Sequence, residues 1–490
     1  MKKAESTNQQ LSRFDVTLVT LILLSFMGGV IALFGSDSLL GATQVAMMMI
    51  GFFAALIGYK NGVTWADLEQ SIIKSSAKTT GPILIFLSIG SLIGSLMLSG
   101  AVPTLLYFGL NTLSPTYFYP LTCIICALVS ICIGSSWTTA ATVGVALIGV
   151  SYGFSLSPEI TAGAIISGAY FGDKMSPLSE TTNLAPSMAG SDLFAHIRHM
   201  AWSSVPSFFV ALIIFFIIGL NSSAMVGSQE SINNFLITLD EYFNISWVNL
   251  IPVLILLWLA VKKCPAFLAI VGVSLLACLF TYLFQYEVLV RFIGDETAID
   301  SVSIIKSFWL VLYDGFNINT SNQNVDNLLS RGGMSSMVNM VWLVIASMMM
   351  TGVLQRIGYI DALLRSMLKM VKSTGSLIAT TMATCFGVNV LTGDQYMSIV
   401  LPGQMWKSEY RKHNLENVNL SRTLEDAGTL TSPLIPWNAC GVYMAGTLAV
   451  ATFDYLPYVF FNLINPIVAL LFAFMNIKIT RISSTKELQV

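Results

Sequence analysis

The chain has 490 residues, of which 55% are hydrophobic and only 10% charged, and its formal net charge is −2. Because a soluble protein of ordinary composition carries about 25% charged residues, this composition excludes a protein dissolved in water. The sequence holds no basic run, which excludes a nucleic-acid partner. Cys123 and Cys126 have no second pair at metal spacing, so we predict no zinc site, no disulfide and no cofactor.

Long apolar segments follow one another along the chain. A hydrocarbon core of about 30 Å takes roughly 20 helical residues, and the segments 16–34, 41–59, 265–287 and 338–354 are of that kind. The apolar run 208–220 does not alternate with polar residues, as a strand of a membrane β-barrel would. We therefore predict an all-α polytopic membrane protein with about ten transmembrane helices.

Lysine and arginine residues mark the cytoplasmic loops of membrane proteins. They occur near both ends of the chain, which predicts two cytoplasmic termini: Lys2, Lys3 and Arg13 at one end, and Lys478, Arg481 and Lys486 at the other. The segment 221–246 has no basic residue and is predicted outside. The same count of basic residues places both ends of the region 118–152 outside and both ends of the region 373–406 inside. We therefore predict two re-entrant hairpins or paired short spans, broken at 134–139 and 391–394.

The sequence contains an internal repeat. Gly172, 176–178 and 188–190 recur 256 residues later as Gly428, 432–434 and 444–446. Weaker similarities align Ser99 and Gly100 with Thr351 and Gly352, and Gly134 with Gly393. Since the charge count places the two hairpins on opposite sides, we predict an inverted-topology repeat with broken helices. The predicted divisions are N-terminal helices and a cytoplasmic loop (1–79), the first repeat (80–220), linking helices and external loops (221–335), the second repeat (336–476) and a cytoplasmic tail (477–490).

Polar residues are concentrated between two apolar flanks in the segment 168–186. Gly172 and Pro177 predict a helix break there, because glycine is a poor helix former and proline removes a donor and clashes with the preceding turn. The side chains around the break supply the hard oxygens that alkali cations prefer: Asp173, Ser176, Ser179, Glu180, Thr181, Thr182 and Asn183. The same break creates a half-helix N-terminus that would suit an anion, and the sequence leaves both alternatives open.

Acidic residues at membrane depth are costly and mark ion paths by default. Asp173 and Asp394 are the predicted sodium ligands, and Thr392 adds a second oxygen beside Asp394. Lys174 next to Asp173 allows an alternative in which the two only neutralise each other. For Asp426 and its neighbour Glu425, a solvated helix end and a place in the ion path are equally compatible with the sequence.

Two further groups of residues have alternative interpretations. The first hairpin carries hydroxyls without an acid, which either ligate an ion or satisfy backbone groups in the turn: Ser135, Ser136, Thr138 and Thr139. His196 and His199 bracket Arg198 at a predicted cytoplasmic end. We expect these histidines to lie on the surface, where their titration near pH 6.5 would suit a regulator.

The motif that runs from Gly172 to Ala185, continued by 192–194 and 196–199, resembles the NhaC-type sodium/proton antiporters of the ion-transporter superfamily. The resemblance extends to the segments 134–139, 392–394, 432–434 and 436–438, which adds Ser432 and Asn438 to the ion-binding or proton-carrying candidates. It implies a carrier in the bacterial plasma membrane that expels sodium by using the proton gradient. The family also includes relatives that exchange malate and lactate, and the motif does not separate the two activities.

Other transport and enzyme classes are disfavoured by what the sequence lacks. It has no GxxxxGK[ST] pattern, which argues against an ATP-driven pump, and no set of nucleophile, base and orienting group, which argues against an enzyme. We therefore expect a secondary transporter that exchanges sodium for protons by alternating access, with an organic-acid exchanger as the alternative. The expected partners are sodium, protons and the lipid bilayer, and a homodimer stays open.

Overall fold

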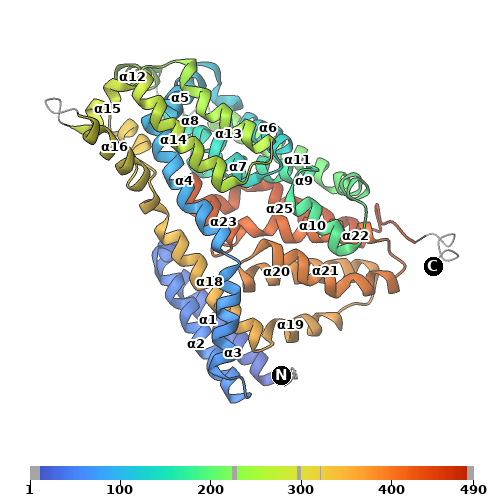
Figure 1. The fold of residues 1–490 in the computed structure, drawn as a ribbon. Helices are drawn as coiled ribbons and strands as arrows, with labels where there is room; N and C mark the ends of the chain where they lie inside the picture. Colours follow the sequence, from blue (N-terminus) through green and yellow to red (C-terminus); the bar gives the residue numbers. More distant parts are fainter. Residues whose placement is uncertain (1–10, 223–228, 295–299, 321, 483–490) are drawn as a thin grey trace.

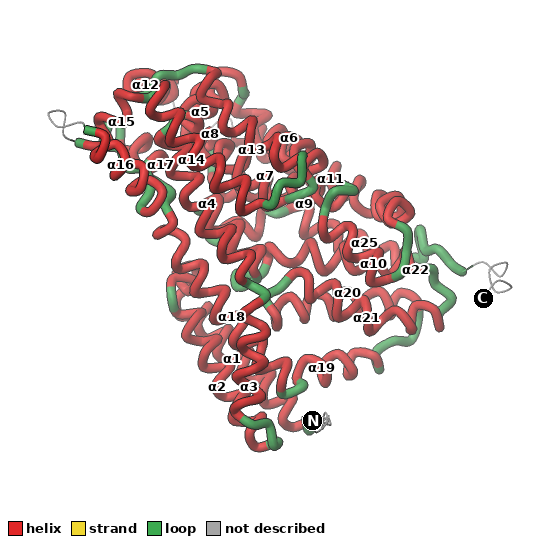
Figure 2. The backbone as a smooth tube through the Cα atoms, in the orientation of Figure 1, coloured by secondary structure: helices red, strands yellow, loops and turns green. Residues whose placement is uncertain are grey.

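The computed structural model describes residues 11–222, 229–294, 300–320 and 322–482. The basic residues Lys2, Lys3 and Lys486, and part of the predicted external segment 221–246, lie outside the described residues. Figure 2 shows that helices fill most of the described chain and that short loops connect them. Apart from one isolated bridge between Leu415 and Arg481, the described residues form no strand. The predicted all-α class is therefore confirmed.

Eight helices in the described chain are long and apolar enough to cross a membrane: Arg13–Phe34 (α1), Ala42–Lys60 (α2), Thr80–Leu98 (α4), Pro115–Ile133 (which includes α6, Phe118–Ile133), Leu193–Asn221 (within α11, Leu193–Ser222), Ala266–Phe284 (α14), Met334–Arg356 (which includes α18, Val338–Arg356) and Thr374–Thr392 (α20). The number rises to ten if each of two sharply bent helix pairs counts as one span. This agrees with the predicted number of about ten, and the four segments predicted from length alone coincide with α1, α2, α14 and α18.

The remaining helices are α3 (Trp65–Ala77), α5 (Ala101–Thr112), α7 (Ser136–Thr139), α8 (Val145–Gly153), α9 (Pro158–Met175), α10 (Glu180–Ala189), α12 (Gln229–Tyr242), α13 (Ile251–Val261), α15 (Tyr286–Ile293), α16 (Ser301–Tyr313), α17 (Gln323–Leu329), α19 (Tyr359–Leu368), α21 (Gln395–Lys412), α22 (Asn417–Leu424), α23 (Ala439–Leu448), α24 (Thr452–Tyr455) and α25 (Phe460–Phe474). In Figure 1, α2 and α3 pack along α18 in the lower part of the molecule and α1 packs on α2, while α20 and α21 lie side by side. The chain therefore turns back between α20 and α21, as the predicted hairpin requires.

Helices α6 and α9 approach each other closely because glycines face the contact. A Cβ atom on Gly168 would collide with the carbonyl oxygen of Cys123, and one on Gly172 with that of Ala127. Small residues at such positions let the backbones of membrane helices come together. The contact fixes the C-terminal end of α9, which carries Asp173, beside the end of α6.

The same succession of helices and breaks occurs in both halves of the chain. Left-handed glycines separate α4 from α5 and α18 from α19, at Gly100 (φ 73°) and Gly358 (φ 77°). They also end α6 and α20, at Gly134 (φ 74°) and Gly393 (φ 61°). The structural counterpart of Gly100 is thus Gly358 rather than Gly352, which the sequence similarity indicated and which lies inside α18.

Candidate functional site

A cavity of about 660 Å³ lies where the broken helices meet. Its walls include the start of α7, the break between α9 and α10, and the first residues of α21 and α23, and α4, α13 and α14 contribute as well. Eight of the predicted site residues line it: Ser135, Ser136, Thr138, Asp173, Ser179, Glu180, Thr181 and Asp394. Lys78 and Lys263, both exposed, line it as well. The fold therefore brings side chains from both halves of the chain to one space.

Each break is built from local sequence signals. Helix α9 ends at Met175, before Pro177, and Ser179 begins α10 by accepting a hydrogen bond from the backbone N–H of Thr182. Gly134 ends α6, and Ser135 then begins α7 by accepting from the N–H of Thr138. Serine is a favoured N-cap because its hydroxyl satisfies an N–H of the first turn. The breaks thus leave few unpaired backbone groups at membrane depth, as the bilayer requires.

Asp173 is the most enclosed acid that lines the cavity, with 6% of its surface exposed. The Ser136 hydroxyl donates a hydrogen bond of 2.8 Å to its Oδ2 atom. By contrast, Thr139 donates to the backbone carbonyl of Ser135 at 2.9 Å. Thr139 therefore satisfies the turn, whereas Ser136 points at an acid, and ion ligation by these hydroxyls stays a prediction.

The other two acids lie in more open parts of the lining. Glu180 is exposed, and its Oε2 atom accepts a hydrogen bond of 2.6 Å from the Tyr396 hydroxyl. Asp394 is partly buried, and its Oδ1 atom accepts from the backbone N–H groups of Tyr396 at 2.8 Å and of Met397 at 3.4 Å. Asp394 therefore caps α21 as well as lining the cavity. Tyr396 was missed in the sequence, although it stands only two residues after Asp394.

The remaining predicted ligands do not line the cavity. Most of them direct a side-chain donor at a backbone carbonyl: Ser176 at Ile131, Thr182 at Lys174, Asn183 at Ser179, Thr392 at Val388 and Ser432 at Thr429. Asn438 donates to the amide oxygen of Asn389 at 3.0 Å. These side chains hold the broken segments in shape, and an ionic role for them stays a prediction.

The alternative in which Lys174 and Asp173 neutralise each other is wrong. The ammonium of Lys174 pairs with Asp426 instead, and both side chains are fully buried. Successive residues of a helix point about 100° apart, so Asp173 faces Ser136 while Lys174 faces the segment that follows α22. Lys174 is therefore not free to hold an anion.

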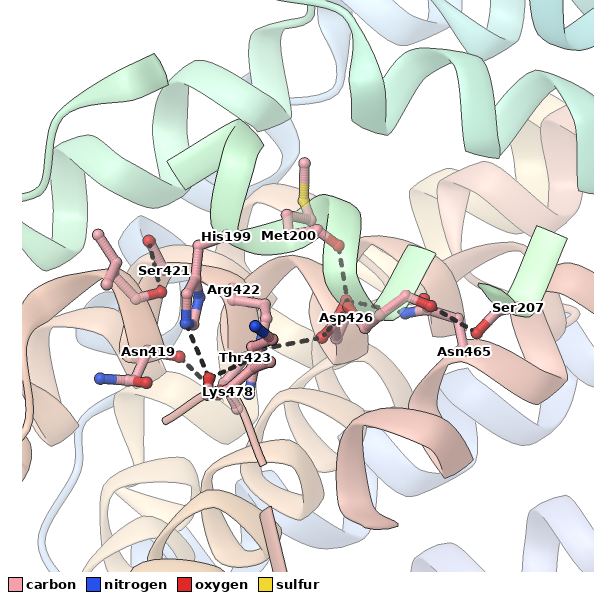
Figure 3. Close-up of polar contacts among 12 residues, drawn as sticks. His199, Met200, Ser207, Asn419, Ser421, Arg422, Thr423, Asp426, Asn465 and Lys478 are labelled. Carbon is pink, nitrogen blue, oxygen red and sulfur yellow. Dashed lines mark hydrogen bonds and ion pairs between the residues drawn. The ribbon is translucent and has the colours of Figure 1, made fainter. Parts of the chain in front are cut away.

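Asp426 sits in a buried polar network (Figure 3). Its carboxylate accepts from Asn465 at 2.8 Å and from Ser203 at 3.2 Å, and the Nε atom of Arg422 lies 3.8 Å away. Because Asp426 and Glu425 are both fully buried, the solvated helix end is the wrong alternative for both. Neither carboxylate oxygen of Glu425 has a hydrogen-bond partner among the described residues.

The surface position expected for the two histidines is wrong for His196. This side chain is fully buried, and its Nδ1 atom lies 2.9 Å from the Ser421 hydroxyl. His199 is partly buried, with Nε2 2.9 Å from the carbonyl oxygen of Lys478 (Figure 3). Both rings therefore connect α11 to the C-terminal part of the chain.

The cavity has the chemistry of a cation site. Carboxylate and hydroxyl oxygens are the ligands that alkali cations prefer, and here they come from three acids and several hydroxyls. Within the described residues, no three His, Cys, Asp or Glu side chains gather as a resident metal centre would need.

Comparisons with known proteins agree with this chemistry. The model of the Na+/H+ antiporter family matches residues 168–477. The Na(+)/H(+) antiporter NhaC of Alkalihalophilus pseudofirmus is 39% identical over 89% of this chain and 90% of its own length. The protein of the same name from Bacillus subtilis is 36% identical over 85% of this chain and 88% of its own. A malate-2H(+)/Na(+)-lactate antiporter of Bacillus subtilis is 32% identical over 88% and 89% of the two chains.

Proposed function

Because this chain belongs to the Na+/H+ antiporter family, we propose that it exchanges sodium ions for protons across the bacterial plasma membrane by alternating access. Both termini lie in the cytoplasm in this proposal, and the two halves are inverted repeats. The observation that carries it is the cavity whose lining contains the carboxylates of Asp173, Glu180 and Asp394 together with hydroxyl groups. Such acids accept either a sodium ion or a proton, so loading one releases the other.

Asp173 is the proposed centre of the sodium site. It is the enclosed acid of the lining, and the Ser136 hydroxyl at 2.8 Å fixes the direction of its carboxylate. Ser135, Thr138 and Thr181 add hydroxyls to the same wall. Asp394 and Glu180 would complete the ligand set or attract the ion from water, since a lining rich in one sign of charge concentrates ions of the opposite sign.

An organic-acid exchanger is the second candidate, and two observations favour it. The cavity of about 660 Å³ is larger than a bare ion needs and falls in the range of small-molecule sites. Lys78 and Lys263 in its lining offer cations to a carboxylate substrate. Against it stands the position of these lysines, which are exposed, whereas the buried Lys174 is occupied by Asp426.

Transport by everted membrane vesicles separates the two candidates. With an imposed proton gradient, adding sodium alone should release protons. The sodium concentration for half-maximal response should rise as the pH falls, because protons compete for the carboxylates. A response to sodium that requires malate or lactate would overturn the first proposal and put the exchanger in its place.

A further inference from the structure

A second cavity, of about 600 Å³, lies elsewhere in the fold. Exposed carboxylates belong to its lining, at Asp37, Asp314 and Asp454, together with one guanidinium, that of Arg331. Hydroxyl and amide groups add to it at Asn317, Ser330 and Thr447. The excess of acids gives this cavity the same preference for cations as the first one.

Three helices line both cavities. On α4, Gly81, Pro82 and Ile85 line the first cavity, and Ile93 and Met97 line the second. On α18 and the turn before it, Met348 lines the first cavity, whereas Met337 and Met340 line the second. At 1.5 Å of rise per residue, Ile85 and Ile93 are about 12 Å apart along α4. The two cavities therefore follow one another along the same helices.

Three aromatic rings occupy the interval between the cavities. The rings of Trp137 and Tyr443 are stacked with centroids 4.2 Å apart. Phe86, which directly follows Ile85 on α4, lies 5.9 Å from Trp137 and 5.6 Å from Tyr443. The Tyr443 hydroxyl donates to the carbonyl oxygen of Trp137 at 2.9 Å, which ties α23 to α7.

The third shared helix passes through this aromatic layer. On α23, Cys440 and Tyr443 line the first cavity, and Ala445 to Leu448 line the second. Trp137 lines the first cavity and directly follows Ser136, whose hydroxyl touches Asp173. The aromatic layer therefore lies next to the candidate ion site, between that site and the second cavity.

We infer that the second cavity is the opposite mouth of a single cation path, and that the layer of Phe86, Trp137 and Tyr443 closes this path in the present conformation. The inference rests on the proposed function, since it gives alternating access a physical gate. By the predicted topology the loop with Lys78 is cytoplasmic and the loop with Asp37 external, so the second cavity is the external mouth. Hydrated sodium ions are the ligands that it would collect.

Accessibility of single cysteines tests the two mouths. In a variant without native cysteines, Leu178→Cys places a thiol in the first cavity and Thr447→Cys one in the second. A positively charged, membrane-impermeant thiol reagent should modify the two thiols from opposite faces of sealed vesicles. Modification of both from the same face would overturn the inference.

Removal of a ring tests the gate. The Trp137→Ala substitution is added to the Leu178→Cys variant, and the reagent is applied on the membrane face from which it modifies Thr447→Cys. The thiol at position 178 should then react at least tenfold faster than it does with Trp137 present. Phe86→Leu should give the same change if Trp137→Ala does not insert in the membrane. The matched control is Trp247→Ala, which removes a ring stacked 3.8 Å from Phe108 and outside both linings. Unchanged rates in both gate variants would overturn the gate. Because labelling needs no transport, this outcome is distinct from failure of the sodium/proton assay.

Discussion

Replacing Ser136 with alanine removes the hydroxyl that contacts Asp173. The hydrogen bond of 2.8 Å has a carboxylate as its acceptor and lies in a buried place. Hydrogen bonds to charged groups contribute about 1.5–3 kcal/mol. At 1.4 kcal/mol for each factor of ten, that energy corresponds to about 10- to 150-fold in binding. We therefore expect Ser136→Ala to raise the sodium concentration for half-maximal transport by at least about tenfold, because the ion loses an oxygen and the carboxylate loses its fixed direction.

The measurement is sodium-dependent proton release from everted vesicles, with the amount of inserted protein determined in parallel. Ser151→Ala is the matched control. The Ser151 side chain is also buried, but it donates to the carbonyl oxygen of Ile148 in its own helix at 2.7 Å and does not line the cavity. An unchanged sodium dependence of Ser136→Ala at normal protein levels would refute the assignment of the site to Asp173.

Two further predictions concern the cap of α21 and the orientation of the repeats. Asp394→Asn should keep the thermal stability of the protein, since asparagine caps a helix as well as aspartate does, while lowering sodium-driven proton release; Asp394→Ala should also cost about 1 kcal/mol of stability. Full sodium transport by the asparagine variant would restrict Asp394 to its capping role. Cysteines at the exposed positions Tyr117 and Lys372, next to the first and the second hairpin, should react with an impermeant reagent from outside and inside respectively. Reaction of both from one side would contradict the inverted orientation.

Much of the fold could be predicted because it depends on local signals. The lengths of the apolar segments locate α1, α2, α14 and α18. The helix breaks follow from glycines that take a left-handed conformation, such as Gly134 and Gly393, and from the prolines that follow α9 and the segment after α22. A membrane strengthens these signals, because a helix that stops inside it must satisfy its backbone groups at once.

The partners of the polar side chains could not be predicted in the same way. Lys174 and Asp426 are 252 residues apart, and Tyr396 and Glu180 are 216 apart. No local pattern reports such contacts, and the adjacent acid Asp173 was the obvious partner for Lys174. Hydroxyls near a break have two uses, and only the structure separates Ser136, which points at an acid, from Thr139, which satisfies a carbonyl.

The short helix α7 connects the candidate ion site with the candidate gate. It has four residues, and two neighbours among them face different partners: Ser136 contacts Asp173 on α9, and Trp137 stacks on Tyr443 of α23. Its backbone continues without a break through a π-helical turn (Ala140–Gly144) into α8, and π-helical turns of this kind are frequent at functional sites. In the proposed site, a sodium ion between Ser136 and Asp173 would contact the residue directly before Trp137. A small shift of α7 would change the ligand set and the aromatic layer together, which gives a direct physical link between ion binding and opening of the path.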